Sequence, residues 1–347
     1  MTAEKKYFAV PEPPRENFAR GLRGVEIPEL GNAIHGKVRD NWVVERNGER
    51  IRVMVTTDRQ SAFDRDVCTV PEKGKVLNLI SAFWFEKTQN IAPNQMLAIP
   101  HPNVLMAKQA EATLPVELIF RRYMATSSTS TSVYTNYFGN ERRGINARRK
   151  IYGIEFPEGL VANQEFPMGT ISTPTTKAES GEHDIELTDE EARDMVNNKF
   201  GAGVWEKAKS IGLELFEHGL NHHKQKGLIL ADTKFEFGLD KNGELILIDE
   251  VFTPDSSRFW RADTYEQRIS EGKNPESFDK EILRRWLADN GFTGEGPVPI
   301  VPSKIINQMA SAYRVPYEMI TEGPLSQDPQ TSNPEPIRKA ILQYLNN

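Results

Sequence analysis

The chain has 347 residues, of which 38% are hydrophobic and 27% are charged, and its formal net charge is -6. This length allows two domains and a small appendage. The negative charge excludes a bulk attraction to nucleic acids or anionic membranes, so any binding of phosphates must be local. The single cysteine, Cys68, excludes an internal disulfide and a cysteine-rich metal site. With no long apolar stretch and no signal-peptide pattern, the chain is expected in the cytoplasm.

The first hundred residues predict an irregular arm followed by a β-hairpin. Residues 1–30 are mixed and contain prolines, whereas residues 42–44 and 51–55 are apolar and flank a turn at Asn47-Gly48. Gly36 and Lys37 precede the hairpin. Glycine lets the backbone approach a ligand closely, and lysine supplies charge for a phosphate. The Walker spacing is absent, however, and a turn with an exposed lysine is the commoner explanation.

Polar segments alternate with apolar ones through the middle of the chain. Residues 56–64 form a polar stretch expected to be a loop, and residues 76–90 have the apolar spacing of a helix. Residues 114–123 predict a strand that passes between two domains. The serine- and threonine-rich run 125–137 and the basic run 142–150 follow, and both are expected to be loops over a cleft, although a basic run is most often a solvated face.

Two helical regions are predicted in the second half. Residues 188–226 are amphipathic, with Thr188 and Glu191 three apart as in a capping box. A second helix, 277–290, carries Lys280 and Arg284 four apart and therefore on one face. That pair suits a phosphomonoester, although lysine and arginine on a helix more often face water. Residues 322–336 are rich in proline and polar side chains, and a short helix is expected near the C-terminus.

The segment 230–260 has the most distinctive pattern. Asp232, Lys234 and Glu236 alternate with apolar residues, a turn follows, and a second apolar strand ends in Asp249 and Glu250. This predicts a β-hairpin with acids on both strands. Alternation alone more often means a two-faced strand with one wet side. The carboxylate pair at the strand end and the dense polar run after it favour a site instead.

A hairpin brings such carboxylates within reach of each other. They would repel unless a cation lay between them, and magnesium is commonly held by one or two carboxylates together with substrate phosphates. We therefore expect Glu236 and Asp249 to bind Mg²⁺, with Lys234 beside them as a contact for a phosphate or carboxylate.

Together these stretches resemble the SAICAR synthetase family over about residues 30–290. The matching runs are GKVRD (36–40), TTDRQSAFD (56–64), ELIFRRY (117–123), TPTTKAESGEHD (173–184), ADTKFEFG through DEVFTPDSSRFW (231–260) and SFDKEILRRW (277–286). The resemblance implies a ligase that joins L-aspartate to the carboxylate of 5-amino-1-(5-phosphoribosyl)imidazole-4-carboxylate, here called the ribotide, while splitting ATP to ADP and phosphate.

The resemblance also implies an α+β fold. A small antiparallel β-sheet domain would lie over a larger ATP-grasp-like domain, with the nucleotide cleft between them. The corresponding boundaries are an N-terminal arm at 1–30, a small β-rich domain at 31–116, a larger domain at 117–300 and a C-terminal extension at 301–347.

By the same resemblance, many residues receive expected roles. Gly36, Lys37, Val38 and Arg39 would cover the ATP phosphates, and the backbone from Glu117 to Ile119 would meet the adenine edge. The residues expected to pair with carboxylates are Arg121, Lys177, Lys234 and Arg258, those expected at the ribotide phosphate are Lys280 and Arg284, and those expected along the substrate side are Ser61, His183, Asp184, Asp232 and Asp255. Asp232 or Asp184 would accept the proton of the attacking amine, and either Ser127 or Ser128 would meet a substrate carboxylate.

Two alternatives remain open at this stage. A small-molecule kinase on a similar fold would use the same hairpin without an amine substrate, and a nucleotide-sensing protein would bind ATP with magnesium and release no phosphate. The expected partners are ATP, aspartate and the ribotide, with no nucleic acid or membrane, in a monomer or small homo-oligomer.

Overall fold

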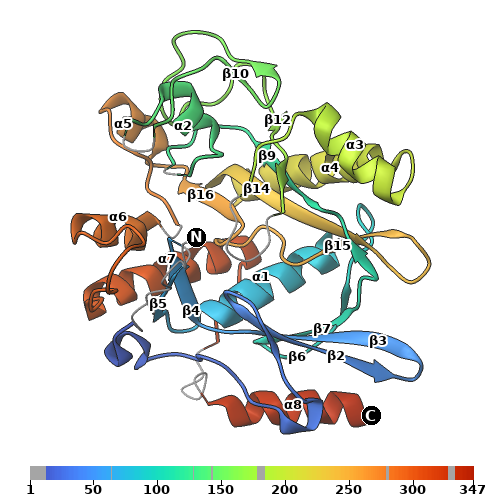
Figure 1. The fold of residues 1–347 in the computed structure, drawn as a ribbon. Coiled ribbons are helices and arrows are strands. Elements are labelled where there is room, and N and C mark those ends of the chain that lie inside the picture. Colours follow the sequence, from blue (N-terminus) through green and yellow to red (C-terminus); the bar gives the residue numbers. More distant parts are fainter. Residues whose placement is uncertain are drawn as a thin grey trace, which may run out of the picture.

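The computed structural model describes residues 13–63, 65–127, 129–141, 144–177, 184–278, 281–326 and 333–347. Two antiparallel sheets form its main layers, and helix α1 (Lys73–Lys87) lies between them in Figure 1. The chain is therefore of mixed α+β type with antiparallel sheets, as expected. Helices lie outside both sheets as well as between them.

The smaller sheet has five strands in the order β1-β2-β3-β7-β6. Its strands are β1 (Ile34–His35), β2 (Arg39–Arg46), β3 (Glu49–Thr56), β6 (Met96–His101) and β7 (Val104–Lys108). The predicted hairpin is confirmed as β2 and β3, joined at Asn47 and Gly48. Both turn residues have positive φ, at 53° and 75°, which is the geometry that lets a two-residue turn follow the twist of the strands.

The larger sheet has seven strands built around β14 (Leu228–Leu239). The others are β8 (Ala112–Thr113), β9 (Val116–Arg121), β12 (Ile171–Ser172), β13 (Thr175–Thr176), β15 (Leu245–Ile248) and β16 (Ser257–Arg261). The predicted 230–260 hairpin is confirmed, with Glu236 opposite Ile248 in the β14–β15 register. Strand β14 also pairs with β9, β16 and β8, so it connects most of this sheet.

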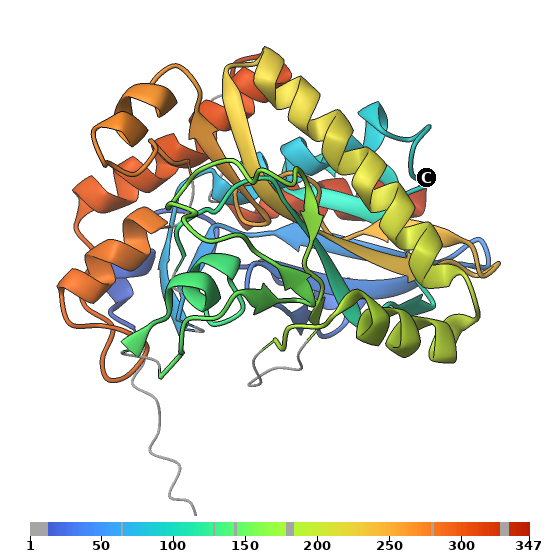
Figure 2. The ribbon, with the colours of Figure 1, turned by 90° about the horizontal axis from the view of Figure 1, so that it is seen from above.

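The remaining helices are α2 (Val133–Phe138), α3 (Asp189–Phe200), α4 (Val204–Gln225), α5 (Tyr265–Ser270), α6 (Glu281–Asp289), α7 (Ser303–Thr321) and α8 (Pro334–Asn346). Figure 2 shows α4 crossing the sheet diagonally. Glycines permit this close packing, because a Cβ on Gly219 would lie 2.4 Å from Phe252 and one on Gly212 would lie 2.7 Å from Phe120.

Helix α1 is buried on nearly all sides. Val76, Leu77, Ile80 and Trp84 are at most 1% exposed, which is typical of a helix inside a core. Its N-terminal backbone fits closely as well, since the Gly74 N–H donates to Asp58 Oδ1 at 2.8 Å. The sequence predicted this helix but not that its apolar residues would be buried all round.

Four segments differ from the expectations. The run 125–137, expected to be a loop, contains most of helix α2. The polar stretch 56–64 was expected to be a loop, but it contains strand β4 (Arg59–Ala62). This strand forms a hairpin with the following strand β5 (Arg65–Thr69). The region 188–226 is two helices, since Gly201 and Gly203 have positive φ and interrupt it; the capping box at Thr188 is confirmed. Helix α7 was not predicted, although it packs into the main core through Met309, Tyr313 and Ile320.

Three smaller features complete the fold. The chain also contains the short pair β10 (Lys150–Ile151) and β11 (Ile154–Glu155) and two 3₁₀ turns, η1 (Arg15–Phe18) and η2 (Pro28–Leu30).

Cys68 is buried, and burial raises the pKa of its thiol to about 12, so it packs as an inert side chain. Among the residues that the structure describes, no helix is long and apolar enough to cross a membrane.

Candidate active site

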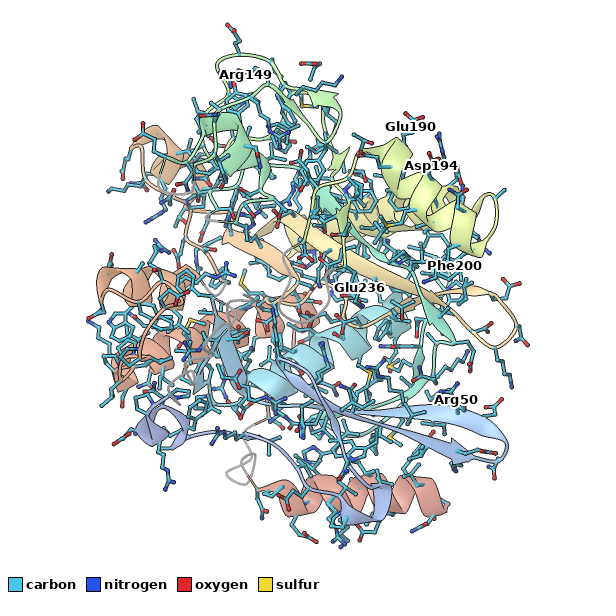
Figure 3. All side chains as sticks on the ribbon, viewed as in Figure 1. Arg50, Arg149, Glu190, Asp194, Phe200 and Glu236 are labelled. Carbon is cyan, nitrogen blue, oxygen red and sulfur yellow. The ribbon has the colours of Figure 1, made fainter. Side chains whose placement is uncertain are left out.

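The polar face of β14 lies at the centre of the candidate site. Lys234 Nζ donates to Glu117 Oε1 at 2.6 Å and to Glu236 Oε1 at 2.9 Å. Lys177, just after β13, forms a second ion pair with Glu236. Figure 3 shows Glu236 in the middle of the molecule, between β14 and α1. Three strands or strand ends therefore bring lysines and carboxylates together at this point.

Asp249 joins this cluster because β15 ends at Ile248. In a regular strand, Asp249 would point to the opposite side from Ile248. Its φ is 64°, a conformation that few residues other than glycine adopt, so the strand cannot continue. Arg39, at the start of β2, donates to Asp249 Oδ1 at 2.8 Å and to Glu250 Oε2 at 2.6 Å. The smaller sheet thereby contacts the carboxylate end of the hairpin.

The pKa values of Glu236 and Asp249 are shifted in opposite directions. Burial alone would raise the pKa of Glu236, but Lys234 and Lys177 outweigh it and lower that pKa to about 2. The pKa of Asp249 is raised to about 6, first by burial and then by the negative charges of Glu236 and Glu250. The two carboxylates thus interact, and burial together with the neighbouring negative charges outweighs the lowering effect of Arg39 on the pKa of Asp249. Although burial opposes it, neighbouring carboxylates raise the pKa of Lys234, which stays protonated.

The carboxylate oxygens of Glu236 and Asp249 fit a magnesium ion that is bound together with a nucleotide. Within the described residues no group of three or more acidic, histidine or cysteine side chains is arranged to hold a metal by itself. Magnesium does not require such a cage, because it is often bound by one or two carboxylates and substrate phosphates. Glu236 and Asp249, both largely buried at 8% and 26% side-chain exposure, offer the oxygen ligands that the ion prefers.

The other end of the polar face is arranged differently. Asp232 Oδ2 accepts from Arg121 at 2.9 Å, and Arg258 contacts both of its carboxylate oxygens. Burial opposes ionisation, yet the two arginines lower the pKa of Asp232. A carboxylate held ionised in this way is a poor proton acceptor. The structure therefore argues against the expectation that Asp232 is the general base.

A cavity of about 270 Å³ opens beside Arg258. Its lining is rich in hydrogen-bond donors and carries two guanidinium groups, and it consists of Thr126, Ser127, Tyr134, Asn140, Arg258, Trp260, Asn274, Pro275, Ser277 and Arg285. Guanidinium groups and hydroxyls are the groups that bind phosphates and carboxylates most effectively. This cavity can therefore hold an anionic group of a substrate.

The expected nucleotide contacts have mixed outcomes. Gly36 and Lys37 are exposed and Val38 is half-buried in a tight turn, in which Gly36 N–H donates to Arg39 O at 2.7 Å. Arg39 is directed to Asp249 and Glu250. The backbone of Glu117 to Ile119 lies inside the sheet, between β14 and the short strands β12 and β13. Its contact with the adenine edge stays a prediction.

The expected substrate residues also divide. Arg121 is buried and donates to Thr173 Oγ1 at 2.8 Å besides Asp232, so its donors are used within the chain. Ser61 is half-buried at the β4–β5 turn, and Asp184 is exposed and close enough to help raise the pKa of Glu117, whose main cause is burial. His183, Ser128 and Lys280 lie outside the described residues. Of the two serines weighed, Ser127 lines the cavity.

Sequence reasoning missed several residues of this site. Arg285 lines the cavity, whereas its predicted neighbour Arg284 does not. Helical spacing could not separate them, because adjacent arginines differ only in the rotation of a helix whose packing was unknown. Glu250 was seen as part of the strand-end pair but not as a partner of Arg39. Lys73 and Tyr313, which contact Asp255, gave no signal.

Comparison with known proteins identifies the family. A family model described as SAICAR synthetase matches residues 32–298. The chain belongs to the SAICAR synthetase family. Among curated SAICAR synthetases, the phosphoribosylaminoimidazole-succinocarboxamide synthase of Legionella pneumophila (strain Lens) is 42% identical over 317 residues, which are 91% of this chain and 95% of that protein.

Solved SAICAR synthetases share the fold. The SAICAR synthase of Saccharomyces cerevisiae, solved in complex with SAICAR, is 30% identical with a TM-score of 0.70 and covers 88% of this chain and 100% of its own. Another SAICAR synthetase, solved in complex with ADP, is 22% identical with a TM-score of 0.60 over 85% of this chain and 100% of its own. At that identity the second likeness concerns the fold alone.

Proposed function

We propose that this chain joins L-aspartate to the carboxylate of the ribotide, giving the succinocarboxamide, ADP and phosphate. Membership of the SAICAR synthetase family makes it an ATP-dependent ligase of purine biosynthesis. The observation that carries the site assignment is the cluster of Glu236, Asp249, Lys234 and Lys177 at the end of the β14–β15 hairpin. It combines oxygen ligands for a cation with ammonium groups for anions.

The nucleotide lies between the two sheets in this proposal, with residues 31–116 over residues 117–300 in an ATP-grasp-like arrangement. The turn at residues 36–38 covers the phosphates in this proposal. Arg39 directly follows the turn and forms ion pairs with Asp249 and Glu250, so the turn lies next to the proposed metal ligands. A SAICAR synthetase of the same fold was solved in complex with ADP, which is consistent with a nucleotide as co-substrate.

Glu236 and Asp249 would hold Mg²⁺, which would neutralise phosphate charge and keep the phosphates in line for transfer. Lys234 and Lys177, both bonded to Glu236, present positive charge to the same region. The ribotide carboxylate oxygen attacks the γ-phosphorus and ADP leaves. This converts a poor acyl donor into one with a phosphate leaving group, and positioned cations stabilise the transferring charge.

The ribotide phosphate binds in the cavity lined by Arg258, Arg285 and Ser127. Two guanidinium groups face a dianion there, and Arg258 is held in place by Asp232 and by the Thr126 carbonyl at 2.9 Å. The SAICAR complex of the yeast relative supports a ribotide site in this fold. Arg284 is adjacent to Arg285 in sequence and Lys280 precedes it by five residues, and we propose both as secondary contacts at the rim.

The amine of aspartate then attacks the activated carbonyl carbon, and phosphate leaves with the bridging oxygen. The amine must lose a proton, and Asp184 is our proposed acceptor because it is exposed on the same side as Glu117 and Lys234. Ser61, His183 and Asp255 complete the proposed substrate side.

A coupled phosphate-release assay tests this function. Purified chain should release phosphate when ATP, magnesium, aspartate and ribotide are all present, and the rate should fall to background when either aspartate or the ribotide is omitted. ADP formation without aspartate, with a stable phosphorylated ribotide, would favour the kinase. ATP binding without any phosphate release in the full mixture would favour a sensor.

A further inference from the structure

Asp255 is held by two side chains from helices that lie far from it in sequence. Lys73 Nζ, at the N-terminus of α1, lies 2.9 Å from Asp255 Oδ2. The Tyr313 hydroxyl, in the middle of α7, donates to Asp255 Oδ1 at 2.6 Å. Each carboxylate oxygen thus has a partner that comes from a core helix. An oxygen of a carboxylate has more than one lone pair, and these two contacts fix the direction in which the carboxylate presents them.

Both partners are buried where a charge or a hydroxyl is costly without bonds. Lys73 is 0% exposed and Tyr313 is 1% exposed. Lys73 Nζ also donates to Arg59 O at 2.8 Å and lies 5.5 Å from the centre of the Tyr313 ring. A buried ammonium group without a carboxylate partner would be strongly destabilising. The Lys73–Asp255 pair therefore fixes the carboxylate to a rigid part of the core.

The Tyr313 hydroxyl is also 2.8 Å from Gln60 Oε1. A tyrosine hydroxyl has one hydrogen, and the charged acceptor, Asp255, makes the stronger bond. Gln60 and Ser61 are consecutive in β4, so the same tyrosine links Asp255 to the strand that carries a proposed substrate residue. Helix α7 begins at Ser303, beyond the family match, which ends at residue 298.

Asp255 lies close to the chemistry without contacting the metal-binding pair. Its side chain is 9% exposed, so its surface is not completely closed. Burial lowers the pKa of Arg39, but the negative charges of Asp249, Glu250 and, to a smaller extent, Asp255 outweigh it and raise that pKa. The carboxylate is therefore within electrostatic reach of the residue that connects the two sheets.

We propose that Tyr313 and Lys73 are positioning residues that orient the Asp255 carboxylate toward a substrate group carrying N–H donors. The proposal rests on the substrate side described above. Both aspartate and the ribotide carry an amino group that Asp255 could bind. Steady-state kinetics with each substrate varied in turn distinguish the two. Tyr313 acts through Asp255 and does not touch the substrate.

The test is the Tyr313→Phe variant, since removing the buried charge of Lys73 risks misfolding. We expect kcat/KM for aspartate or for the ribotide to fall roughly 10- to 100-fold, as for the loss of a bond to a charged group, while KM for ATP changes less than about twofold. The matched control is Tyr317→Phe, one helical turn along α7, where we expect wild-type kinetics. Within the described residues the Tyr317 hydroxyl has no hydrogen bond.

A double-mutant cycle separates positioning from a general structural role. If Tyr313 acts through Asp255, adding Tyr313→Phe to Asp255→Asn should lower kcat/KM less than about twofold further. Where turnover of Asp255→Asn is below detection, the cycle is measured on substrate binding by calorimetry. An undiminished effect in the Asp255→Asn background, or wild-type kinetics for Tyr313→Phe, would overturn the proposal. A wild-type chain that releases no phosphate would instead overturn the proposed function itself, and this inference with it.

Discussion

The two ends of the polar face of β14 differ in how their charges are balanced. At one end, Asp232 is bound by two arginines, and its pKa is lowered despite burial. At the other, Asp249 has one arginine that it shares with Glu250, and its pKa is raised to about 6. The first end has surplus positive charge, which suits an anionic substrate. The second brings Glu236, Asp249 and Glu250 together among lysines and Arg39, which offers oxygen ligands to a cation.

The comparison shows why charged residues four apart on one strand can have different functions. Side-chain direction is the same for Asp232 and Glu236, since both lie on one face of β14. What differs is the neighbouring strand: β9 and β16 supply arginines to Asp232, whereas the end of β15 supplies carboxylates near Glu236. Removing Glu236 should therefore reduce activity most, whereas removing Asp232 should reduce stability most.

The largest effect on activity is expected for Glu236→Gln. The amide keeps the shape of the side chain but removes the charge that would bind magnesium, so kcat should fall roughly 10²- to 10³-fold or more in the phosphate-release assay. Circular dichroism should remain that of the wild type. The control is Glu244→Gln on the same hairpin, which is exposed and should be fully active. Near-normal turnover of the first variant would refute the metal assignment.

Asp232→Asn is expected to affect stability most. It leaves two buried guanidinium groups without their carboxylate, which should lower the free energy of unfolding by about 3–5 kcal/mol. Because the folded pKa of Asp232 is lowered, its stabilisation is present above the unfolded pKa of about 4 and is lost as the pH falls through the folded value. Urea titrations at pH 7 and at decreasing acid pH should show the two proteins converging.

The more exposed pair Arg122–Glu165, directly after the end of β9, provides the control for that measurement. Glu165→Gln should change the free energy of unfolding by less than about 1 kcal/mol, as surface ion pairs do. Equal destabilisation by both substitutions would mean that the buried network at Asp232 is no more important than a surface contact.

The anion cavity can be tested with two adjacent arginines. Arg285→Ala should raise KM for the ribotide by roughly 10- to 100-fold, because a hydrogen bond from a cavity-lining guanidinium group to the phosphate is lost. Arg284→Ala, outside the cavity lining, should have a clearly smaller effect, and neither should change KM for ATP by much. The reverse order of effects would assign the phosphate to the other face of α6.

The smallest effect is expected at the exposed turn. Lys37→Ala should raise KM for ATP by no more than roughly fivefold, since a charge pair in water contributes less than about 1 kcal/mol. KM for the ribotide should not change. A large loss of turnover would show that this lysine is covered by the nucleotide and contributes in the transition state.

The strongest local patterns were predicted correctly. The hairpins around Asn47-Gly48 and 238–243 and the capping box at Thr188 all follow from spacing and turn chemistry. Helix α7 was not predicted, and it contains Pro316, a residue that opposes a helix locally. The helix nevertheless forms, since packing of Tyr313 and Met309 in the core compensates for local preference.

The sequence by itself determined which residue types meet in the site, because alternation and turn residues specify a hairpin locally. It also determined the family, through runs of matching residues. Only the tertiary structure decided which charges are already satisfied. The partners of Asp232, Glu236, Asp249 and Asp255 come from strands and helices distant in sequence, and whether a buried carboxylate is paired or open depends on those distant contacts, which no local pattern encodes.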